Sequence, residues 1–225
     1  MILPNPGKTK LVILDLDGTI IDSGPGIKSC LRKTMAEFHL PSPSEEELQA
    51  FVGPPMRDSF QTKCGLSPSQ AEAALAVYRT AYIREGLFDG FIYEGIPALL
   101  QYLANHNITV ALGTSKPWVL AHRVLRHFHL RHLVDRVFGC YRDGRLDSKA
   151  QVLESLLAHY YPPGCGSVAG DEVIMVGDRF YDVEGAMACG LATAGVTYGY
   201  GSKEELTKAG AAALLDHPMD LIRYL

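Results

Sequence analysis

Several features that would assign a protein to a class are missing from this sequence. No apolar run approaches the roughly 20 residues that cross a bilayer, and no charged leader followed by an apolar stretch opens the chain. Basic residues do not outnumber acidic ones, since the formal net charge is −4, so the basic surface typical of nucleic-acid-binding proteins is not predicted. We therefore expect neither a membrane protein nor one whose partner is nucleic acid.

Cysteine is also sparse, and its spacing matches none of the common paired motifs. The five cysteines are scattered and none forms a C-x-x-C pair: they are Cys30, Cys64, Cys140, Cys165 and Cys189. Scattered thiols are typical of reduced cytosolic proteins rather than of secreted proteins held by disulfides. We predict a cytoplasmic location, and the sequence leaves the oligomeric state open.

What the chain does contain is an alternation of apolar runs and amphipathic stretches. Of its 225 residues, 47% are hydrophobic, which is enough for a substantial core. Apolar runs predict strands at 11–17, 108–114, 136–140, 173–178, 192–197 and, more weakly, 212–215. Helices are predicted at 94–106, 117–129, 148–160 and 180–189. This alternation indicates an α/β fold, a Rossmann-like parallel sheet with helices on both faces.

A long insertion separates the first predicted strand from the second. About ninety residues lie between them, far more than one crossover helix needs. Most of this segment has helical character, at 26–39, 44–51 and 67–86. We predict a helical cap domain over 23–90, inserted into an α/β core made of 1–22 and 91–225.

Particular residues mark where three of the predicted helices begin. Pro117 suits a first helical turn, where the missing N–H is no loss. Ser44 with Glu47, and Ser202 with Glu205, have the spacing of a capping box, in which each side chain caps the backbone N–H of the other residue. The second box predicts a further short helix that ends near Gly210.

Polar side chains follow three of the predicted strands at their carboxyl ends. The first strand ends in D-L-D-G, where Asp15 and Asp17 start on the same side because residues i and i+2 of an extended chain do so. The second ends in G-T-S-K and the fourth in G-D-R-F-Y-D, which adds Asp178 and Asp182. Ligands of open parallel sheets bind at the carboxyl ends of the strands, so these groups are predicted to converge, together with Lys149 at a helix start.

The predicted cluster is negatively charged, and clustered carboxylates repel one another unless a positive group lies among them. Oxygen donors without His or Cys favour Mg²⁺, which binds one or two carboxylates together with substrate phosphate and water. A lysine and a hydroxyl beside the cluster suit a phosphoryl group, whose charge is spread over several oxygens. The sequence therefore predicts a Mg²⁺ site and a small phosphorylated metabolite as the partner.

Four segments together resemble the motifs of the haloacid dehalogenase-like hydrolases. They are D-L-D-G-T-I-I-D-S from Asp15, L-G-T-S-K-P from Leu112, the lysine at 149, and M-V-G-D-R-F-Y-D-V-E-G-A from Met175. The resemblance is closest to phosphoglycolate phosphatase-type members with a helical cap. It runs over nearly the whole chain, including F-V-G-P-P-M in the predicted cap and G-V-T-Y-G-Y-G-S-K-E-E-L near the end.

The resemblance implies roles for the residues that carry chemistry. Asp15 resembles the nucleophile that attacks phosphorus. Asp17 resembles the general acid for the leaving alkoxide and then the general base for water. Thr114 and Ser115 resemble the phosphate-binding residues, and Lys149 resembles the cation that offsets charge on nucleophile and phosphate.

The resemblance also implies a Mg²⁺ site. Its ligands are expected to be the carboxylates of Asp15 and Asp178 and the backbone carbonyl of Asp17. Asp182 is expected to orient the lysine or a metal-bound water. Many relatives have a proline after the motif lysine, whereas Ala150 follows Lys149 here, so the start of that helix could differ.

Other interpretations of individual residues stay open on sequence grounds. Lys149 is also compatible with a solvent-exposed position on a helix. Asp182 is also compatible with a negative charge that the dipole stabilises at a helix N-terminus. Arg57, in the predicted cap, is a candidate for substrate specificity because it could bind a substrate carboxylate or phosphate bidentately, but simple surface exposure fits equally. The segment H-R-V-L-R-H-F-H-L-R-H, from His122, lacks the zinc-site spacing and predicts a solvated basic helix.

We predict a Mg²⁺-dependent phosphatase that acts through an aspartyl-phosphate. Dehalogenating members of the family lack the second aspartate, and an alkoxide leaving group needs the proton that Asp17 could supply. Phosphoglycolate, a nucleoside monophosphate and a sugar phosphate all fit as substrates. The alternatives are a phosphosugar mutase of the same family, a non-enzymatic phosphoacceptor domain and an inactive binding protein.

The nucleophile assignment predicts the effect of one conservative change. Asp15→Asn is expected to abolish Mg²⁺-dependent phosphatase turnover, because an amide oxygen is a poor nucleophile, and to leave the fold intact. Phosphate release and circular dichroism measured on the same sample test both parts. Residual Mg²⁺-dependent turnover above a mock preparation would contradict the assignment.

Overall fold

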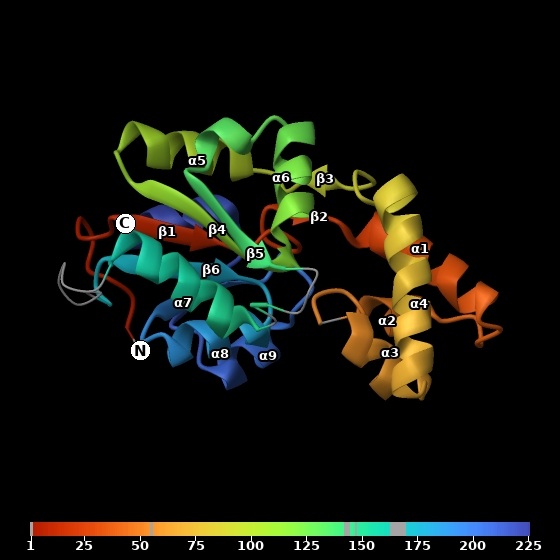
Figure 1. Cartoon of the computed structure of the whole chain (residues 1–225). Coiled ribbons are helices and arrows are strands. Elements are labelled where there is room, and N and C mark those ends of the chain that lie inside the picture. Colours follow the sequence, from red (N-terminus) through yellow and green to blue (C-terminus); the bar gives the residue numbers. More distant parts are fainter. Residues whose placement is uncertain (1, 55, 142–144, 147, 163–169) are drawn as a thin grey trace. The chain divides into compact units, whose positions relative to one another are not determined.

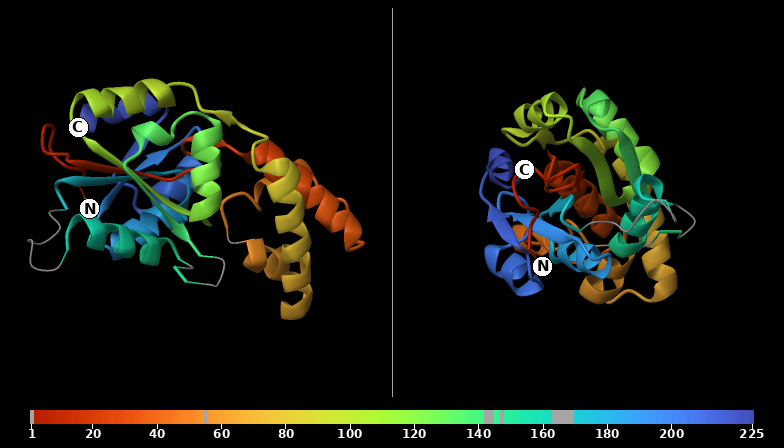
Figure 2. Two further views of the ribbon diagram at one scale, coloured as in Figure 1. Left: turned by 45° about the horizontal axis from the view of Figure 1, so that its top comes forward. Right: turned by 90° about the vertical axis from the view of Figure 1, so that its left-hand side faces the viewer.

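The structure is a computed structural model that describes residues 2–54, 56–141, 145–146, 148–162 and 170–225. The chain divides into two compact units (Figures 1 and 2). One comprises Met1–Ile21 and Ile92–Leu225, and the other comprises Asp22–Phe91. We call them the sheet unit and the helical unit.

The sheet unit is built on six parallel strands in the order β5-β4-β1-β6-β7-β8. They are β1 (Leu11–Leu14), β4 (Thr109–Pro117), β5 (Arg136–Cys140), β6 (Val173–Gly177), β7 (Ala192–Val196) and β8 (Ala213–Leu215). β1 is central, since it pairs with β4 on one side and with β6 on the other. All four residues of β1 are buried, because helices cover both faces.

Figure 1 shows α5 and α6 on one face of the sheet and α7 and α8 on the other. The helices of the sheet unit are α5 (Ile96–Asn105), α6 (Trp118–His127), α7 (Lys149–Tyr160), α8 (Phe180–Ala188) and α9 (Lys203–Ala209), with 3₁₀ turns η2 (Arg131–Leu133) and η3 (Pro218–Tyr224). Beneath α7 and α8, a core cluster joins Ile13 of β1, Met175 of β6 and Leu153 of α7, all with no exposed surface. The predicted parallel α/β architecture is confirmed.

One predicted helix start is wrong. Pro117 is the last residue of β4 and the N-cap of α6, with ψ at 126°, so it lies before the helix rather than in its first turn. β4 remains extended for three residues beyond the predicted strand end at 114. A proline also favours extended backbone in the residue before it, here Lys116.

The helical unit consists of α1 (Gly24–Glu37), α2 (Glu45–Gln49), α3 (Met56–Cys64) and α4 (Pro68–Ala81), which continues into a π-helical turn η1 (Tyr82–Gly86). α3 was not predicted from the sequence, because only Ser59 and Phe60 of its nine residues are buried and the apolar pattern is weak. Two short strands, β2 (Ile21–Asp22) and β3 (Phe91–Ile92), pair where the chain passes between the two units.

The two predicted capping boxes have different outcomes. Ser44 and Glu47 form a complete box at the start of α2, as predicted. Ser202 caps α9 by accepting from the Glu205 N–H, but the Glu205 carboxylate does not complete the box. It accepts instead from Arg179 Nε, at 2.8 Å, and from the Phe180 N–H, at 3.0 Å, at the start of α8.

The sequence predicts neither membrane-spanning helices nor disulfides. No helix within the described ranges combines the length and the apolar character that crossing a membrane requires. Cys30, Cys64 and Cys189 are free thiols, whereas Cys165 lies outside the described residues.

Packing in the helical unit predicts the effect of removing its largest fully buried side chain. Phe60 has no exposed surface, and its ring lies 6.0 Å from that of Phe51 and 6.5 Å from that of Tyr78. Phe60→Ala is expected to lower the free energy of unfolding by about 3–5 kcal/mol, because it leaves a cavity. Phe91→Ala is the matched control, since Phe91 is 54% exposed. Equal losses in urea titrations of the two variants would contradict this packing.

Candidate active site

The carboxyl end of β1 carries the first two carboxylates. Asp15 follows the strand directly, and its N–H donates to the Val176 carbonyl of β6 at 3.0 Å, so the pairing with β6 continues one residue past β1. Gly18 then adopts φ +83°, and a Cβ there would lie 2.1 Å from Asp178 Oδ2. Only glycine allows this turn to pass so close to the neighbouring carboxylate.

The carboxyl end of β6 carries two more carboxylates. Asp178 follows the strand and has no exposed surface. Asp182 lies in the first turn of α8 and accepts from the Arg179 N–H at 3.1 Å. Asp15, Asp178 and Asp182 each place a carboxylate oxygen within 4.8 Å of the others. Three of the four predicted carboxylates therefore share one buried cluster.

Lys149 supplies the positive charge of this cluster. It is the first residue of α7, which a capping box of Ser148 and Gln151 starts at this position. Its Nζ lies 3.0 Å from Asp15 Oδ1 and 2.7 Å from Asp182 Oδ1, and it donates to the Gly113 carbonyl at 2.9 Å. Its side chain is only 4% exposed, so the solvated alternative is wrong.

Burial dominates the electrostatics of the cluster. It raises the pKa of Asp15 to about 6, with Asp182 and Asp17 adding to the rise and Lys149 and a hydrogen bond from Thr114 opposing it. Burial, followed by the charges of Asp182 and Asp15, raises the pKa of Asp178 well above its usual range. Burial acts to lower the pKa of Lys149, but the two carboxylates that it contacts raise it overall.

The cluster fits a hard divalent cation. Asp178 Oδ1 is buried, and no hydrogen-bond partner for it and no ion pair of Asp178 lie among the described residues. Within the same residues, the aspartate cluster is the sole group of three or more His, Cys, Asp or Glu side chains close enough to share an ion. An oxygen-only donor set with one unsatisfied carboxylate oxygen suits Mg²⁺.

Backbone encloses the other side of Asp178. The Tyr200 N–H donates to Asp178 Oδ2 at 2.8 Å. A Cβ at Gly199 would lie 2.4 Å from Asp178 Cβ, and one at Gly201 would lie 2.0 Å from the Asp178 carbonyl oxygen. The hydrogen bond from the Tyr200 N–H and these close approaches were not predicted from the sequence, because they depend on how a distant loop folds.

The end of β4 brings the remaining predicted residues to the sheet edge. Thr114 is 1% exposed, and its side-chain hydrogen bond to Asp15 lowers the pKa of that carboxyl group. Ser115 is exposed to solvent. The side chain of Asp17 does not join the aspartate cluster. Both of its oxygens accept from Lys116 Nζ, at 2.8 and 2.7 Å. The position of Lys116 at this edge was predicted from the sequence, but its pairing with Asp17 was not.

Arg57 lies outside the sheet unit. It is the second residue of α3 in the helical unit, where its Nε pairs with Glu72, and its side chain is 42% exposed. Its role in specificity stays a prediction.

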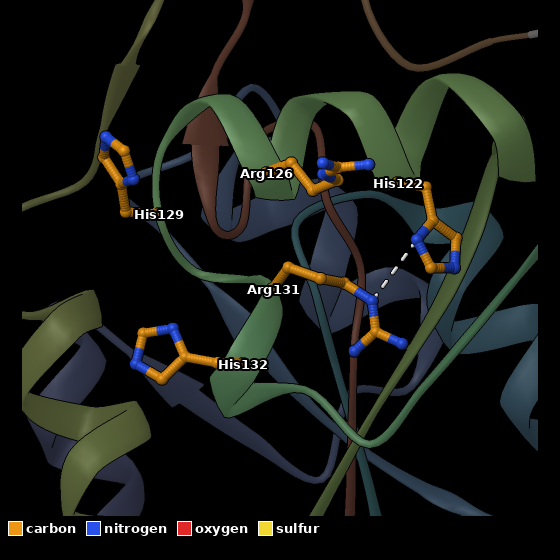
Figure 3. Close-up of a pocket in the computed structure, with 5 residues that line it drawn as sticks. All are labelled: His122, Arg126, His129, Arg131 and His132. Atoms are coloured by element: carbon orange, nitrogen blue, oxygen red, sulfur yellow. Dashed lines mark hydrogen bonds between the residues drawn. The ribbon is translucent and has the colours of Figure 1, made fainter.

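The histidine-rich segment is not one continuous helix. α6 ends at His127, and His129 adopts a positive φ of 58°. A pocket of about 710 Å³ is lined by His122, Arg126, His129, Arg131 and His132. Figure 3 shows these side chains on α6 and on the turn that follows it. Arg131 Nε donates to His122 Nδ1 at 3.2 Å. The basic character is as predicted, and α6 lies within the predicted helix 117–129, but the helix predicted for the segment from His122 does not continue to His132.

A family model described as haloacid dehalogenase-like hydrolase matches residues 12–196. The chain belongs to this family. The match spans every residue of the aspartate cluster, as well as Asp17, Thr114, Lys116 and Lys149.

Proteins that are similar to this chain carry different names. A 5'-nucleotidase of Pseudomonas aeruginosa is 32% identical over 87% of this chain and 86% of that protein. The tyrosine-protein kinase PtkA of Mycobacterium tuberculosis is 36% identical over 93% of this chain and 70% of that protein. A phosphoglycolate phosphatase of Rhodospirillum rubrum is 31% identical over 92% of this chain and 87% of that protein.

A crystal structure of a predicted phosphatase from Clostridium acetobutylicum superposes with a TM-score of 0.88 at 34% identity, covering 96% of this chain and 97% of that one. The fold predicted from the family resemblance is therefore confirmed.

The different surroundings of two aspartates predict opposite effects of the same substitution. Asp178→Asn is expected to stabilise the metal-free protein by about 1–3 kcal/mol, because it removes a buried carboxylate that lies beside the carboxylates of Asp15 and Asp182. Asp182→Asn is the matched comparison and is expected to destabilise, because it weakens the contact with Lys149. Thermal unfolding in EDTA measures both.

The same experiment tests the metal site. Adding Mg²⁺ is expected to raise the Tm of the wild type, because a ligand that binds only the folded state stabilises it. The Tm of Asp178→Asn is expected to respond less. An equal rise in both proteins would contradict a role for Asp178 in binding the ion.

Proposed function

We propose that the protein is a Mg²⁺-dependent phosphatase that hydrolyses a small phosphomonoester through an aspartyl-phosphate. The observation that carries this proposal is the contact of Asp15 with Lys149 beside two further buried carboxylates. A carboxylate nucleophile needs nearby positive charge to approach an anionic phosphate. Lys149 provides part of that charge, and a divalent cation would provide the rest.

In the first step, an Asp15 oxygen forms a bond to phosphorus while the bond from phosphorus to the ester oxygen breaks. Asp17, in its protonated form, gives its proton to the departing oxygen, which leaves as an alcohol. Thr114 and Lys149 hold the phosphoryl oxygens. Both side chains are buried at the end of the sheet and come from elements fixed by the core.

In the second step, water attacks phosphorus and Asp17 accepts its proton. The bond from Asp15 to phosphorus breaks, which frees inorganic phosphate and restores the carboxylate. Asp15, Asp178 and the Asp17 carbonyl would hold Mg²⁺, which when bound offsets negative charge on the phosphoryl oxygens. Asp182 fixes Lys149, through the contact of 2.7 Å between Asp182 Oδ1 and Lys149 Nζ.

The substrate class is proposed from the relatives. Two of them are named for phosphate release from a nucleotide and from phosphoglycolate, so we propose a small phosphorylated metabolite of this kind. The helical unit, Asp22–Phe91, is proposed to act as a cap that selects the leaving group, with Arg57 as a candidate contact. A cytoplasmic location accords with the free thiols.

A second candidate function follows from the relative that is named a tyrosine-protein kinase. Such an enzyme would transfer a phosphoryl group from a nucleotide to a tyrosine rather than to water. The same nucleophile and cation cluster could carry the group in transit. The identity of the acceptor, water or tyrosine, separates the two functions.

A substrate screen tests the proposal. With Mg²⁺ present, the wild type is expected to release inorganic phosphate from at least one of phosphoglycolate, nucleoside 5′-monophosphates and small sugar phosphates, and EDTA is expected to stop the release. Isomerised sugar phosphate without free phosphate would indicate a mutase. Transfer from labelled ATP to a tyrosine peptide would indicate a kinase, and a phosphorylated protein that persists would indicate a phosphoacceptor.

The screen also tests Arg57. Arg57→Ala is expected to raise KM for the preferred substrate about tenfold or more, the worth of a charged hydrogen bond, with little change for p-nitrophenyl phosphate. Arg79→Ala is the matched control, since Arg79 is an exposed arginine of the same helical unit. An unchanged KM in the Arg57 variant would remove this residue from the site.

A further inference from the structure

Asp17 forms an ion pair with Lys116, which is a different lysine from Lys149 of the aspartate cluster. Lys116 Nζ lies 2.8 Å from Asp17 Oδ1 and 2.7 Å from Asp17 Oδ2. The side chains are 5% and 17% exposed, so water competes little for either partner. One cation that contacts both oxygens restrains the rotation of the carboxylate as well as its position.

The local structure of β4 explains how Lys116 reaches Asp17. Lys116 follows Thr114 by two residues in an extended strand, so both side chains start on the same side. The pairing with β5 shifts register between Thr114 and Pro117, an irregularity of the kind that redirects side chains at a sheet edge. The Lys116 N–H donates to Thr114 Oγ1 at 3.2 Å, which ties the two residues together.

Glycine on the neighbouring strand makes room for this stretch of backbone. A Cβ at Gly139 of β5 would lie 2.4 Å from the Lys116 carbonyl oxygen and 2.9 Å from the Trp118 N. The segment that carries Lys116 therefore packs directly on the backbone of β5, which fixes where the lysine begins. A side chain at 139 would push it away.

The two lysines divide the charges of the site between them. Lys149 contacts Asp15 and Asp182, whereas Lys116 contacts Asp17. A shared cation would draw the Asp17 carboxylate towards the nucleophile. Separate cations hold the two aspartates apart and give each a fixed direction.

We propose that Lys116 is a positioning residue that orients the Asp17 carboxylate for proton transfer to the leaving group. This inference rests on the proposed function. Proton transfer depends steeply on the placement of donor and acceptor, and a displacement of about 1 Å can cost roughly 100-fold in rate. Lys116 acts through Asp17 and needs no contact with the substrate.

The test compares Lys116→Met on two kinds of substrate. An alkyl phosphate needs a proton on its leaving oxygen, whereas p-nitrophenyl phosphate releases a stable phenolate without one. The value of kcat/KM reports the steps up to leaving-group release and excludes the later attack of water. We expect kcat/KM to fall about 10–100-fold for the alkyl phosphate and less than about threefold for p-nitrophenyl phosphate.

Three further proteins complete the experiment. Asp17→Asn combined with Lys116→Met is expected to be no slower on the alkyl phosphate than Asp17→Asn alone, because residues that act as one unit are not additive. Lys116→Arg, which keeps a charged bidentate donor, is expected to recover part of the substrate ratio. Lys10→Met is the matched control: Lys10 pairs with Glu172 just before β1, away from the carboxyl end.

The outcomes separate the two levels of the proposal. A wild type that releases no phosphate from any substrate would overturn the proposed function and this role with it. With an active wild type, equal falls on both substrates in Lys116→Met would overturn the positioning role and leave the phosphatase intact, as would additive losses in the double variant. If Lys116→Met does not fold by circular dichroism, Lys116→Arg decides: falls in kcat/KM that are equal for the alkyl phosphate and for p-nitrophenyl phosphate would overturn the positioning role.

Discussion

Excess negative charge in a small buried volume is the constraint on which the rest of this site depends. Three carboxylates lie within 4.8 Å of one another, and one lysine contacts two of them. Such a cluster is stable only if the scaffold holds it rigidly, because each side chain would otherwise turn away from the others. The parallel sheet does so, since β1 is buried and paired on both sides, and Asp15 and Asp178 extend from adjacent strands.

The rigid scaffold also decides which charges meet. Lys149 is the first residue of α7 and contacts Asp15 and Asp182. Lys116 lies on β4 and forms an ion pair with Asp17. The site therefore has two lysines that contact different aspartates. One lies beside the proposed nucleophile and the other beside the proposed proton donor, so attack and protonation are supported by separate parts of the fold.

Residues that follow directly from a strand end were predictable from sequence. Asp15, Thr114 and Asp178 each sit where an apolar run stops, and the geometry of parallel sheets brings such positions together. The Lys116–Asp17 pair was not predictable, because it depends on β4 staying extended to Pro117 and on a register shift. Glu205 shows the same limit: its spacing from Ser202 predicted a local box, but it instead holds Arg179 and Phe180 on another helix.

The glycines around Asp178 separate what can vary in this protein from what cannot. At Gly18, Gly199 and Gly201 even one added methyl would overlap Asp178 or its carbonyl. Substitution of these three glycines would therefore disturb the position of Asp178, so this part of the site tolerates almost no change of sequence. A change in substrate specificity would have to arise from substitutions elsewhere, for example in the helical unit. The same reaction could then be kept while the preferred substrate changes.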